Sequence, residues 1–191
     1  GNPCSLDVIR KFCDDNGLYL FEDNCESMGA KLNGKFCGTF GDIGTFSTFF
    51  SHHISTMEGG IILTENEETF HLMKSLRAHG WTRDLPYDSS ICDRGEDDFY
   101  EAYRFILPGY NARPLDLSGA IGIEQLKKLD SMIAIRRKNA EVFVSLFSKD
   151  DRFIIQKENG KSSWFSFTIV LNPKYAINRS SVMKAMRKAE I

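Results

Sequence analysis

The segment SLDVIRKFCDDNGLYLFED, residues 5–23, decides the fold class. Its first half places apolar side chains at helical spacing, and Gly17 is a typical stop for a helix. The next four residues, 18–21, form an apolar run that is typical of a buried strand, and two acids follow it. A helix, a glycine, a buried strand and then polar residues make up half of a βαβ unit. The segment therefore predicts an α/β protein with a strand over 18–22.

The rest of the chain extends this pattern. Apolar and aromatic residues predict strands over 43–50 and 61–64, the second of them buried, and Asn66 is a typical N-cap for a helix that runs to about His79. Further helices are predicted by a long helical pattern over 115–150 and a shorter one over 179–188, while residues 81–105 are polar and irregular. A loop of that length is usually functional or disordered. The predicted outline is an α/β region followed by a smaller α+β part.

Charge and cysteine content exclude several classes of protein. Lys and Arg number 24 and Asp and Glu 26, and the net charge of −2 gives no reason to expect nucleic acid or an anionic membrane as a partner. No apolar run is long enough to span a bilayer, and no signal peptide is visible. The five cysteines are scattered without CxxC spacing, so neither a disulfide framework nor a zinc site is predicted. Reduced thiols in a cytoplasmic protein are the simplest interpretation.

Two polar residues stand at or near the ends of predicted strands. Asp23 follows a strand at the end where open α/β sheets bind ligands, although an aspartate there can equally be a helix cap or a loop acid. Ser47 lies in the aromatic run 45–49, where its hydroxyl could bind a phosphate or simply bond to the backbone. Neither residue identifies a site by itself.

The pair His52-His53 and two loops are the other candidates. Imidazole titrates near neutrality, which suits acid–base catalysis, whereas adjacent histidines rarely reach one metal ion, so no metal site is predicted. The Glu-Gly-Gly turn at 58–60 would let the backbone approach a ligand closely, but it is also consistent with a plain turn into the next strand. The polar side chains of the loop at 110–113 could reach a ligand, but the loop is also consistent with a simple solvated loop.

Four motifs in a fixed order carry a resemblance to a known family: EDNCESMGA at 22–30, GDIGTFS at 41–47, SHHISTMEGG at 51–60 and GYNAR at 109–113. Together they resemble the sugar aminotransferase family, most clearly from Gly1 to Leu129. The resemblance implies the aspartate-aminotransferase fold of the type I pyridoxal-phosphate-dependent transferases. It also implies that the chain is a segment of a longer enzyme. Residues 1–114 would be part of the cofactor-binding large domain, 115–150 a long connecting helix and 151–191 part of a small C-terminal domain.

The resemblance also implies roles for four residues. Asp23 matches the acid that pairs with the pyridine nitrogen of pyridoxal or pyridoxamine phosphate, where a carboxylate keeps the ring protonated and electron-withdrawing. Glu26 matches the position beside the ring's 3-oxygen, where the family usually has glutamine. Ser47 matches a phosphate-binding serine, and Asn111 matches a residue that reaches the phosphate from the neighbouring subunit. A homodimer with a shared active site is therefore implied.

His52 is the main departure from the family pattern. Five residues after the phosphate serine, aminotransferases of this family carry the lysine that binds the cofactor covalently, and this chain has His52 there, with no lysine between Lys35 and Lys74. Imidazole cannot form that covalent bond, but it can move protons. The exchange is the mark of the family's 3-dehydratase branch. It implies that His52 is the acid–base group in the removal of the 3-hydroxyl from a nucleotide-linked 4-keto-6-deoxy sugar.

Cysteine positions separate two kinds of 3-dehydratase. One kind holds an iron–sulfur cluster on cysteines downstream of the histidine, and only Cys92 lies beyond position 37 here, so no cluster is predicted. The other kind acts on GDP-4-keto-6-deoxymannose, on the route to colitose in lipopolysaccharide O-antigens, and regenerates pyridoxamine phosphate with L-glutamate. The stretch 49–60 resembles the second kind, which predicts this substrate and this amino donor.

Two alternatives stay open at the level of sequence. An ordinary nucleotide-sugar aminotransferase would require a lysine where His52 stands. The other alternative is an inactive fragment or interaction module. By the resemblance, this chain would lack the family's N-terminal segment, which normally helps to form the phosphate site.

Overall fold

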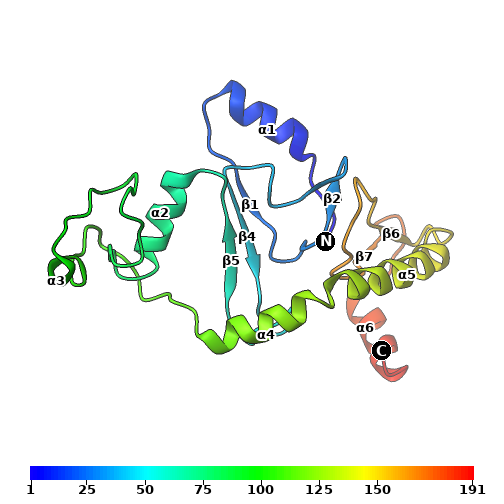
Figure 1. Ribbon diagram of the computed structural model, residues 1–191. Coiled ribbons are helices and arrows are strands. Elements are labelled where there is room, and N and C mark those ends of the chain that lie inside the picture. The colour runs from blue at the N-terminus through cyan, green and yellow to red at the C-terminus, as the bar shows by residue number, and fades with distance from the viewer.

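The computed structural model describes all residues from 1 to 191, arranged as short helices and strands around a small central sheet (Figure 1). In chain order the elements are α1 (Leu6–Asp15), β1 (Phe21–Asp23), β2 (Lys31–Leu32), β3 (Lys35–Phe36), β4 (Ile43–Ser47), β5 (Gly60–Leu63), α2 (Glu67–Leu76), α3 (Asp98–Glu101), α4 (Asp116–Leu126), α5 (Leu129–Phe147), β6 (Phe153–Ile155), β7 (Ile169–Leu171) and α6 (Arg179–Lys188).

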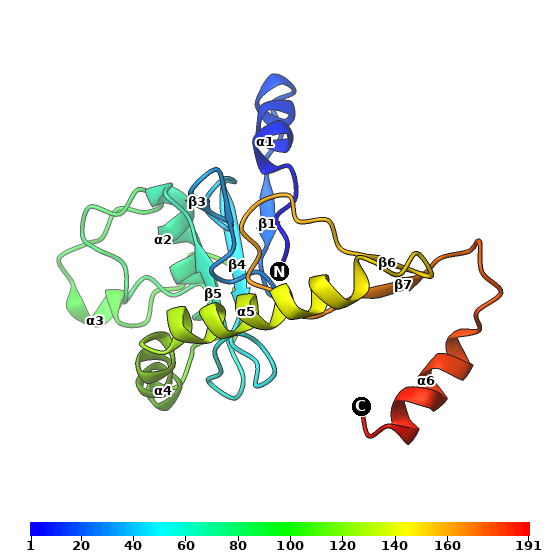
Figure 2. The ribbon, with the colours of Figure 1, turned by 90° about the vertical axis from the view of Figure 1, so that its right-hand side faces the viewer.

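The central sheet has the strand order β1–β4–β5. β1 and β4 run parallel, with Asp23 opposite Thr45, and β5 is antiparallel to β4, with Gly60 opposite Ser47. In Figures 1 and 2, α1 lies beyond one end of these strands and α4 beyond the other. The carboxyl ends of β1 and β4 are at the end that faces α4.

The strands differ from the sequence-based predictions in position and in burial. β1 covers 21–23 rather than 18–22, and β4 ends at Ser47 rather than at residue 50. The prediction that the apolar runs 18–21 and 61–64 are buried is wrong, since Phe21 is 64% exposed and Ile62 is 55% exposed. α1 and α4 lie at the ends of the sheet rather than across its faces (Figures 1 and 2), which leaves these apolar side chains open to solvent.

Helix starts agree with prediction where the chain supplies a local cap, whereas α2 ends at Leu76 rather than at about His79. The side chain of Asn66 accepts a hydrogen bond from the backbone N–H of Thr69 at 2.7 Å, which satisfies a free donor in the first turn of α2. Asn178 caps α6 in the same way, and α6 has the predicted bounds.

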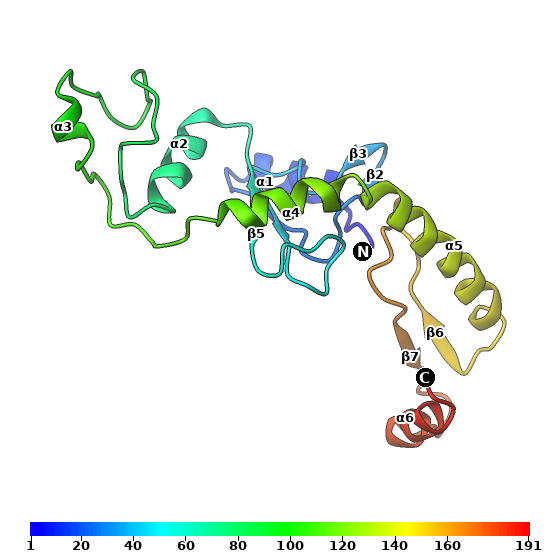
Figure 3. The same ribbon diagram turned by 60° about the horizontal axis from the view of Figure 1, so that its bottom comes forward.

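The prediction of one continuous helix over 115–150 is wrong. α4 ends at Leu126 and α5 begins at Leu129, and the two helices meet at an angle in Figure 3. Lys127 has φ −59° and ψ −23°, so the backbone departs only slightly from helical geometry at the bend and the apolar pattern continues through it. The bend accompanies packing of Leu129 and Met132 against the side chains below β4.

Three small apolar clusters take the place of one large core, and 31 of the 191 residues are buried. The first cluster lies under α1, and its buried members are Leu6, Ala30, Leu32 and Cys37. The second joins β4 and the following loop to the start of α5, with Met28, Phe46 and Ile54 buried. The third joins α5 to the β6–β7 hairpin, with Ala140, Phe143 and Trp164 buried. α6 stands apart from all three in Figure 2. The second cluster is the one that positions the site.

The long segment 81–105 is organised around one buried carboxylate. Glu101, at the end of α3, accepts hydrogen bonds from the Gly95 amide at 2.9 Å, the Thr82 hydroxyl at 3.1 Å and the Arg104 guanidinium at 2.9 Å. Such charge-assisted bonds explain how a polar segment holds a defined path without an apolar core.

None of the helices combines the length and apolar character needed to cross a membrane.

Candidate active site

One end of the sheet gathers two of the predicted site residues. Asp23 is the last residue of β1 and Ser47 is the last residue of β4, and these strands are parallel, so both residues lie at the same end. The loop 48–59 leaves from this end and returns to it at Gly60, which pairs with Ser47. The loop that carries His52 therefore leaves the sheet at the strand ends that carry Asp23 and Ser47, and Figure 2 shows this loop below β4 and β5.

Asp23 is an exposed carboxylate without a cationic partner in the chain. One of its oxygens accepts a hydrogen bond from the Cys25 amide at 3.1 Å. Hydrogen bonds from the thiol and the backbone of Cys25 lower the pKa of Asp23, and the same contact with Asp23 raises the pKa of Cys25 to about 11. Asp23 therefore stays ionised at neutral pH and can receive a cationic group.

The two glutamates beside Asp23 differ in environment. Glu22 is 5% exposed, and its carboxylate accepts hydrogen bonds from the backbone N–H groups of Gly38 at 2.7 Å, Phe40 at 2.6 Å and Gly41 at 2.6 Å. It fixes the turn that leads into β4. Glu26 is exposed in the turn after β1, so it is available to a ligand.

The loop after β4 is closed at its base by two threonines. The hydroxyls of Thr48 and Thr56 are 2.7 Å apart, and the backbone N–H of Thr56 donates to the Thr48 carbonyl at 2.8 Å. The Thr48 N–H donates to the carbonyl of Gly59, whose φ of 139° is unfavourable for a residue with a side chain. The buried side chain of Ile54 joins the cluster with Phe46 and Met28. The loop therefore holds its histidines on a fixed frame.

The two histidines of this loop have different roles in the structure. His53 is 3% exposed, and its Nε2 lies 3.4 Å from the Ser163 carbonyl. Burial, and then the charge of Arg136, lower the pKa of His53 to about 4, so the ring is neutral and anchors the loop. His52 is only half-buried, its Nδ1 has no hydrogen-bond partner, and its Nε2 makes no hydrogen bond within the chain. His52 is the histidine that can exchange protons with a ligand.

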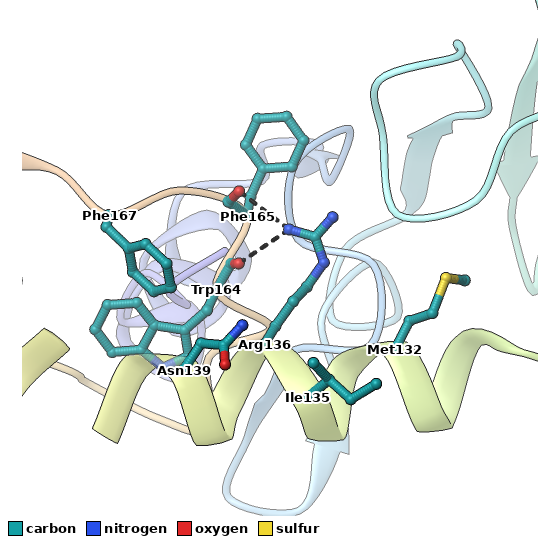
Figure 4. Close-up of a pocket in the computed structure, with 7 residues that line it drawn as sticks. All are labelled: Met132, Ile135, Arg136, Asn139, Trp164, Phe165 and Phe167. Carbon is teal, nitrogen blue, oxygen red and sulfur yellow. Dashed lines mark hydrogen bonds between the residues drawn. The ribbon is translucent and has the colours of Figure 1, made fainter. Parts of the chain in front are cut away.

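A segment more than 100 residues further along the chain reaches this loop. The ring of Phe165 lies 5.4 Å from that of His52 and 5.7 Å from that of His53, centroid to centroid. Phe165 also lines a hollow of about 350 Å³ between α5 and the segment 164–167, together with Met132, Ile135, Arg136, Asn139, Trp164 and Phe167 (Figure 4). Sequence analysis missed this segment, and no local pattern in it points to the histidine loop.

Asn111 and Ser47 complete the set of predicted residues. Ser47 is half-buried, and its hydroxyl accepts a hydrogen bond from the Phe49 amide at 3.2 Å. Asn111 is exposed and pairs with Ala78 at the end of α2, so the chain does not bring it to the sheet end that carries Asp23 and Ser47.

The structure shows no cluster of three or more His, Cys, Asp or Glu side chains that could hold a metal ion, and all five cysteines are free.

Comparison with known proteins decides the family. The model of the DegT/DnrJ/EryC1/StrS aminotransferase family matches residues 1–191. The chain belongs to this family. The resemblance recognised from the four motifs is confirmed.

Among curated relatives, the chain is 53% identical over 192 residues to the GDP-4-keto-6-deoxy-D-mannose 3-dehydratase of Yersinia pseudotuberculosis, covering 100% of this chain and 49% of that protein. It is 49% identical to the enzyme of the same name from Escherichia coli O55:H7, covering 100% of this chain and 50% of that protein. The chain thus spans about half the length of the curated relatives it matches.

Solved structures confirm the fold. The Escherichia coli GDP-4-keto-6-deoxy-D-mannose-3-dehydratase with bound hydrated PLP matches with a TM-score of 0.97 and 49% identity, over 100% of this chain and 49% of that one. A second structure of a GDP-4-keto-6-deoxymannose-3-dehydratase, with a trapped PLP-glutamate geminal diamine, matches with the same TM-score and 48% identity, over 100% of this chain and 50% of that one. The predicted fold class, an α/β fold of the PLP-dependent aminotransferase type, is confirmed.

Proposed function

We propose that this chain forms the acid–base part of a pyridoxamine- or pyridoxal-phosphate-dependent sugar 3-dehydratase, a lyase with an aminotransferase fold, and that its substrate is GDP-4-keto-6-deoxymannose. The observation that carries the proposal is His52, an imidazole with unpartnered nitrogens in the loop where the family's aminotransferases have a lysine. The relatives at 53% and 49% identity bear the name of this enzyme and support the substrate assignment.

The side chains at the end of the sheet fit a pyridine cofactor. Asp23 is ionised and lacks a cationic partner, which suits it to hold a protonated ring nitrogen. Ser47 presents a hydroxyl at the adjacent strand end for the phosphate. Glu26 is exposed in the turn that follows Asp23, where it is available to the cofactor ring. The orphaned Nδ1 of His52 gives the loop a free polar atom for a ligand. The lysines nearest to His52 along the chain are Lys35 and Lys31, in the β2–β3 hairpin. Their ammonium groups lie over the rings of Phe40 and Phe36, respectively.

The chain's own groups would then perform the proton transfers. When bound, the cofactor supplies an amine for the sugar's 4-keto group and a ring that withdraws electrons. Asp23 keeps the proton on the ring nitrogen. His52 accepts a proton at an unpartnered ring nitrogen and delivers a proton to the oxygen of the departing 3-hydroxyl, which leaves as water.

The overall reaction needs a reductant because replacing C3–OH by C3–H is a two-electron reduction. Oxidation of L-glutamate to 2-oxoglutarate and ammonia supplies those two electrons, and the water released from the sugar balances the water used in hydrolysis. A relative solved with a PLP-glutamate adduct supports glutamate as the donor. No iron–sulfur cluster takes part in this scheme.

The larger setting belongs to the same proposal. The enzyme would act as a cytoplasmic homodimer in which Asn111 reaches the partner's phosphate site, and its product would enter colitose for lipopolysaccharide O-antigen. The exposed position of Asn111, away from its own sheet end, supports a contact across subunits. The chain would contribute 1–114 to the large domain, 115–150 to the connection and 151–191 to the small domain.

Borohydride trapping of the full-length protein tests the proposal. We expect the protein to bind pyridoxal phosphate, seen by absorbance, without gaining a pyridoxyl group in the intact mass after reduction. The variant His52→Lys is the matched control and is expected to gain it. A stable adduct on the unmodified protein would instead favour a nucleotide-sugar aminotransferase, and an absence of cofactor binding would favour an interaction module without enzymatic activity.

A further inference from the structure

The ring of His52 is held by aromatic packing and not by hydrogen bonds. It contacts Phe49 at 5.9 Å with the rings inclined by 69°, and Phe165 at 5.4 Å with an inclination of 35°. Edge-to-face and tilted pairs at these distances are attractive. Most acid–base histidines are oriented by a hydrogen bond to one ring nitrogen, and His52 has none within the chain. The two phenylalanines are therefore the groups that fix its orientation.

Phe165 is in turn fixed by α5. The Nη1 atom of Arg136 donates hydrogen bonds to the carbonyls of Trp164 at 3.3 Å and Phe165 at 3.2 Å (Figure 4). The Nε atom of Arg137 donates to the Ser162 carbonyl at 2.9 Å. The Trp164 side chain is buried in the cluster around Phe143. The backbone on both sides of Phe165 is thus tied to a helix outside the histidine loop.

We propose that Phe165 is a positioning residue for His52, and that Arg136 acts on the same histidine by holding Phe165 in place. This inference rests on the proposed function, because it assigns Phe165 to the acid–base step. Phe165 restricts the rotation of the His52 ring and thereby determines where the ring nitrogens point. The C-terminal part of the chain therefore contributes to the step that removes the hydroxyl, although it carries no acid–base group of that step.

The test compares Phe165→Leu with Phe167→Leu in the full-length protein. Phe167 lines the same hollow and stacks on Phe143 at 5.0 Å, but it makes no ring contact with His52. The ring signal of His52 is followed by NMR on histidine-labelled protein and assigned with His52→Asn. Turnover of GDP-4-keto-6-deoxymannose is measured alongside, with kcat and KM determined separately.

We expect Phe165→Leu to shift and broaden the His52 signal and to lower kcat by roughly three- to tenfold, with KM nearly unchanged. Phe165→Tyr keeps the ring and should restore both, and Phe167→Leu should change neither. An unchanged His52 signal in Phe165→Leu, or an equal change in Phe167→Leu, would overturn the inference. The NMR signal does not depend on turnover, so an inactive protein would count against the proposed function alone.

Arg136→Gln gives a second test if Phe165→Leu fails to fold. It removes the guanidinium bonds to both carbonyls and retains all the aromatic side chains. The His52 signal is expected to broaden and kcat to fall, by less than in Phe165→Leu. A folded Arg136→Gln protein with an unaltered His52 signal would overturn the role assigned to Arg136.

Discussion

The buried ring of His53 leads to a specific dependence of stability on pH. Burial, with the charge of Arg136, lowers the pKa of His53 from 6.5 to about 4. Between these two values the unfolded chain binds a proton at this ring and the folded chain does not, so the free energy of unfolding falls as the pH falls. At about 1.4 kcal/mol per pKa unit, the loss is about 2 kcal/mol near pH 5 and approaches about 3 kcal/mol once the folded ring is itself protonated.

Urea unfolding followed by tryptophan fluorescence, at about pH 7.5 and about pH 5, measures this loss in the full-length protein. His53→Gln lacks the titrating ring, and carboxylates such as Asp23 titrate in both proteins and cancel in the comparison. The wild type should therefore lose about 2 kcal/mol more than His53→Gln. His79→Asn is the matched control, because His79 is exposed, has φ 64°, and asparagine tolerates that conformation. Equal losses in the wild type and His53→Gln would refute the reasoning.

Two further substitutions separate the frame of the site from its ligand contacts. Glu22→Gln puts an amide donor against a backbone N–H that in the wild type donates to a carboxylate, so it should lower the free energy of unfolding in urea by about 2–4 kcal/mol. The exposed control Glu26→Gln should change this free energy by about 0.5 kcal/mol or less. Similar effects of the two substitutions would contradict the structural role assigned to Glu22. Asp23→Asn should leave stability nearly unchanged but weaken pyridoxal phosphate binding by roughly tenfold or more in an absorbance titration, since a charge-assisted bond is lost; unchanged affinity would remove Asp23 from the cofactor site.

Features of the fold that depend on neighbouring residues were predictable from sequence. α2 and α6 have asparagine caps that act within three residues, so their starts could be placed. The break between α4 and α5 could not, because Lys127 and Lys128 carry no stop signal and the backbone there is nearly helical. The bend accompanies the packing of Leu129 against the cluster below β4, which is a contact between distant parts of the chain.

The strands show why apolar character alone misjudges burial. Leu20 and Glu22 are buried and Phe21 is exposed, so burial alternates along the strand although the sequence there does not alternate between apolar and polar residues. The run 18–21 was instead interpreted as fully buried because its residues are uniformly apolar. Applying period two would have placed Glu22 on the same side as Leu20 and identified it as a buried carboxylate that needs donors.

For the site, the spacing from Ser47 singled out His52 as the acid–base candidate, but the sequence did not show how either histidine ring is packed. Nothing in the string His52-His53 says which ring is buried, since that depends on Ser163 and Phe165, more than 100 residues away. The roles of Asp23 and Ser47 remain predictions, although the structure places both at one end of the sheet.

The replacement of a lysine by a histidine has a structural consequence that connects these observations. A lysine that forms a covalent bond to its cofactor is oriented by that bond, whereas an imidazole must be oriented by the protein itself. In this chain the base of the loop is closed by Thr48 and Thr56, and its far side is held by the contacts of His53 and by Phe165. His52 thus has a frame on two sides while both of its nitrogens stay free of hydrogen bonds. A ring held by packing does not use its nitrogens for hydrogen bonds within the chain, which is the requirement that a mobile acid–base group places on the fold.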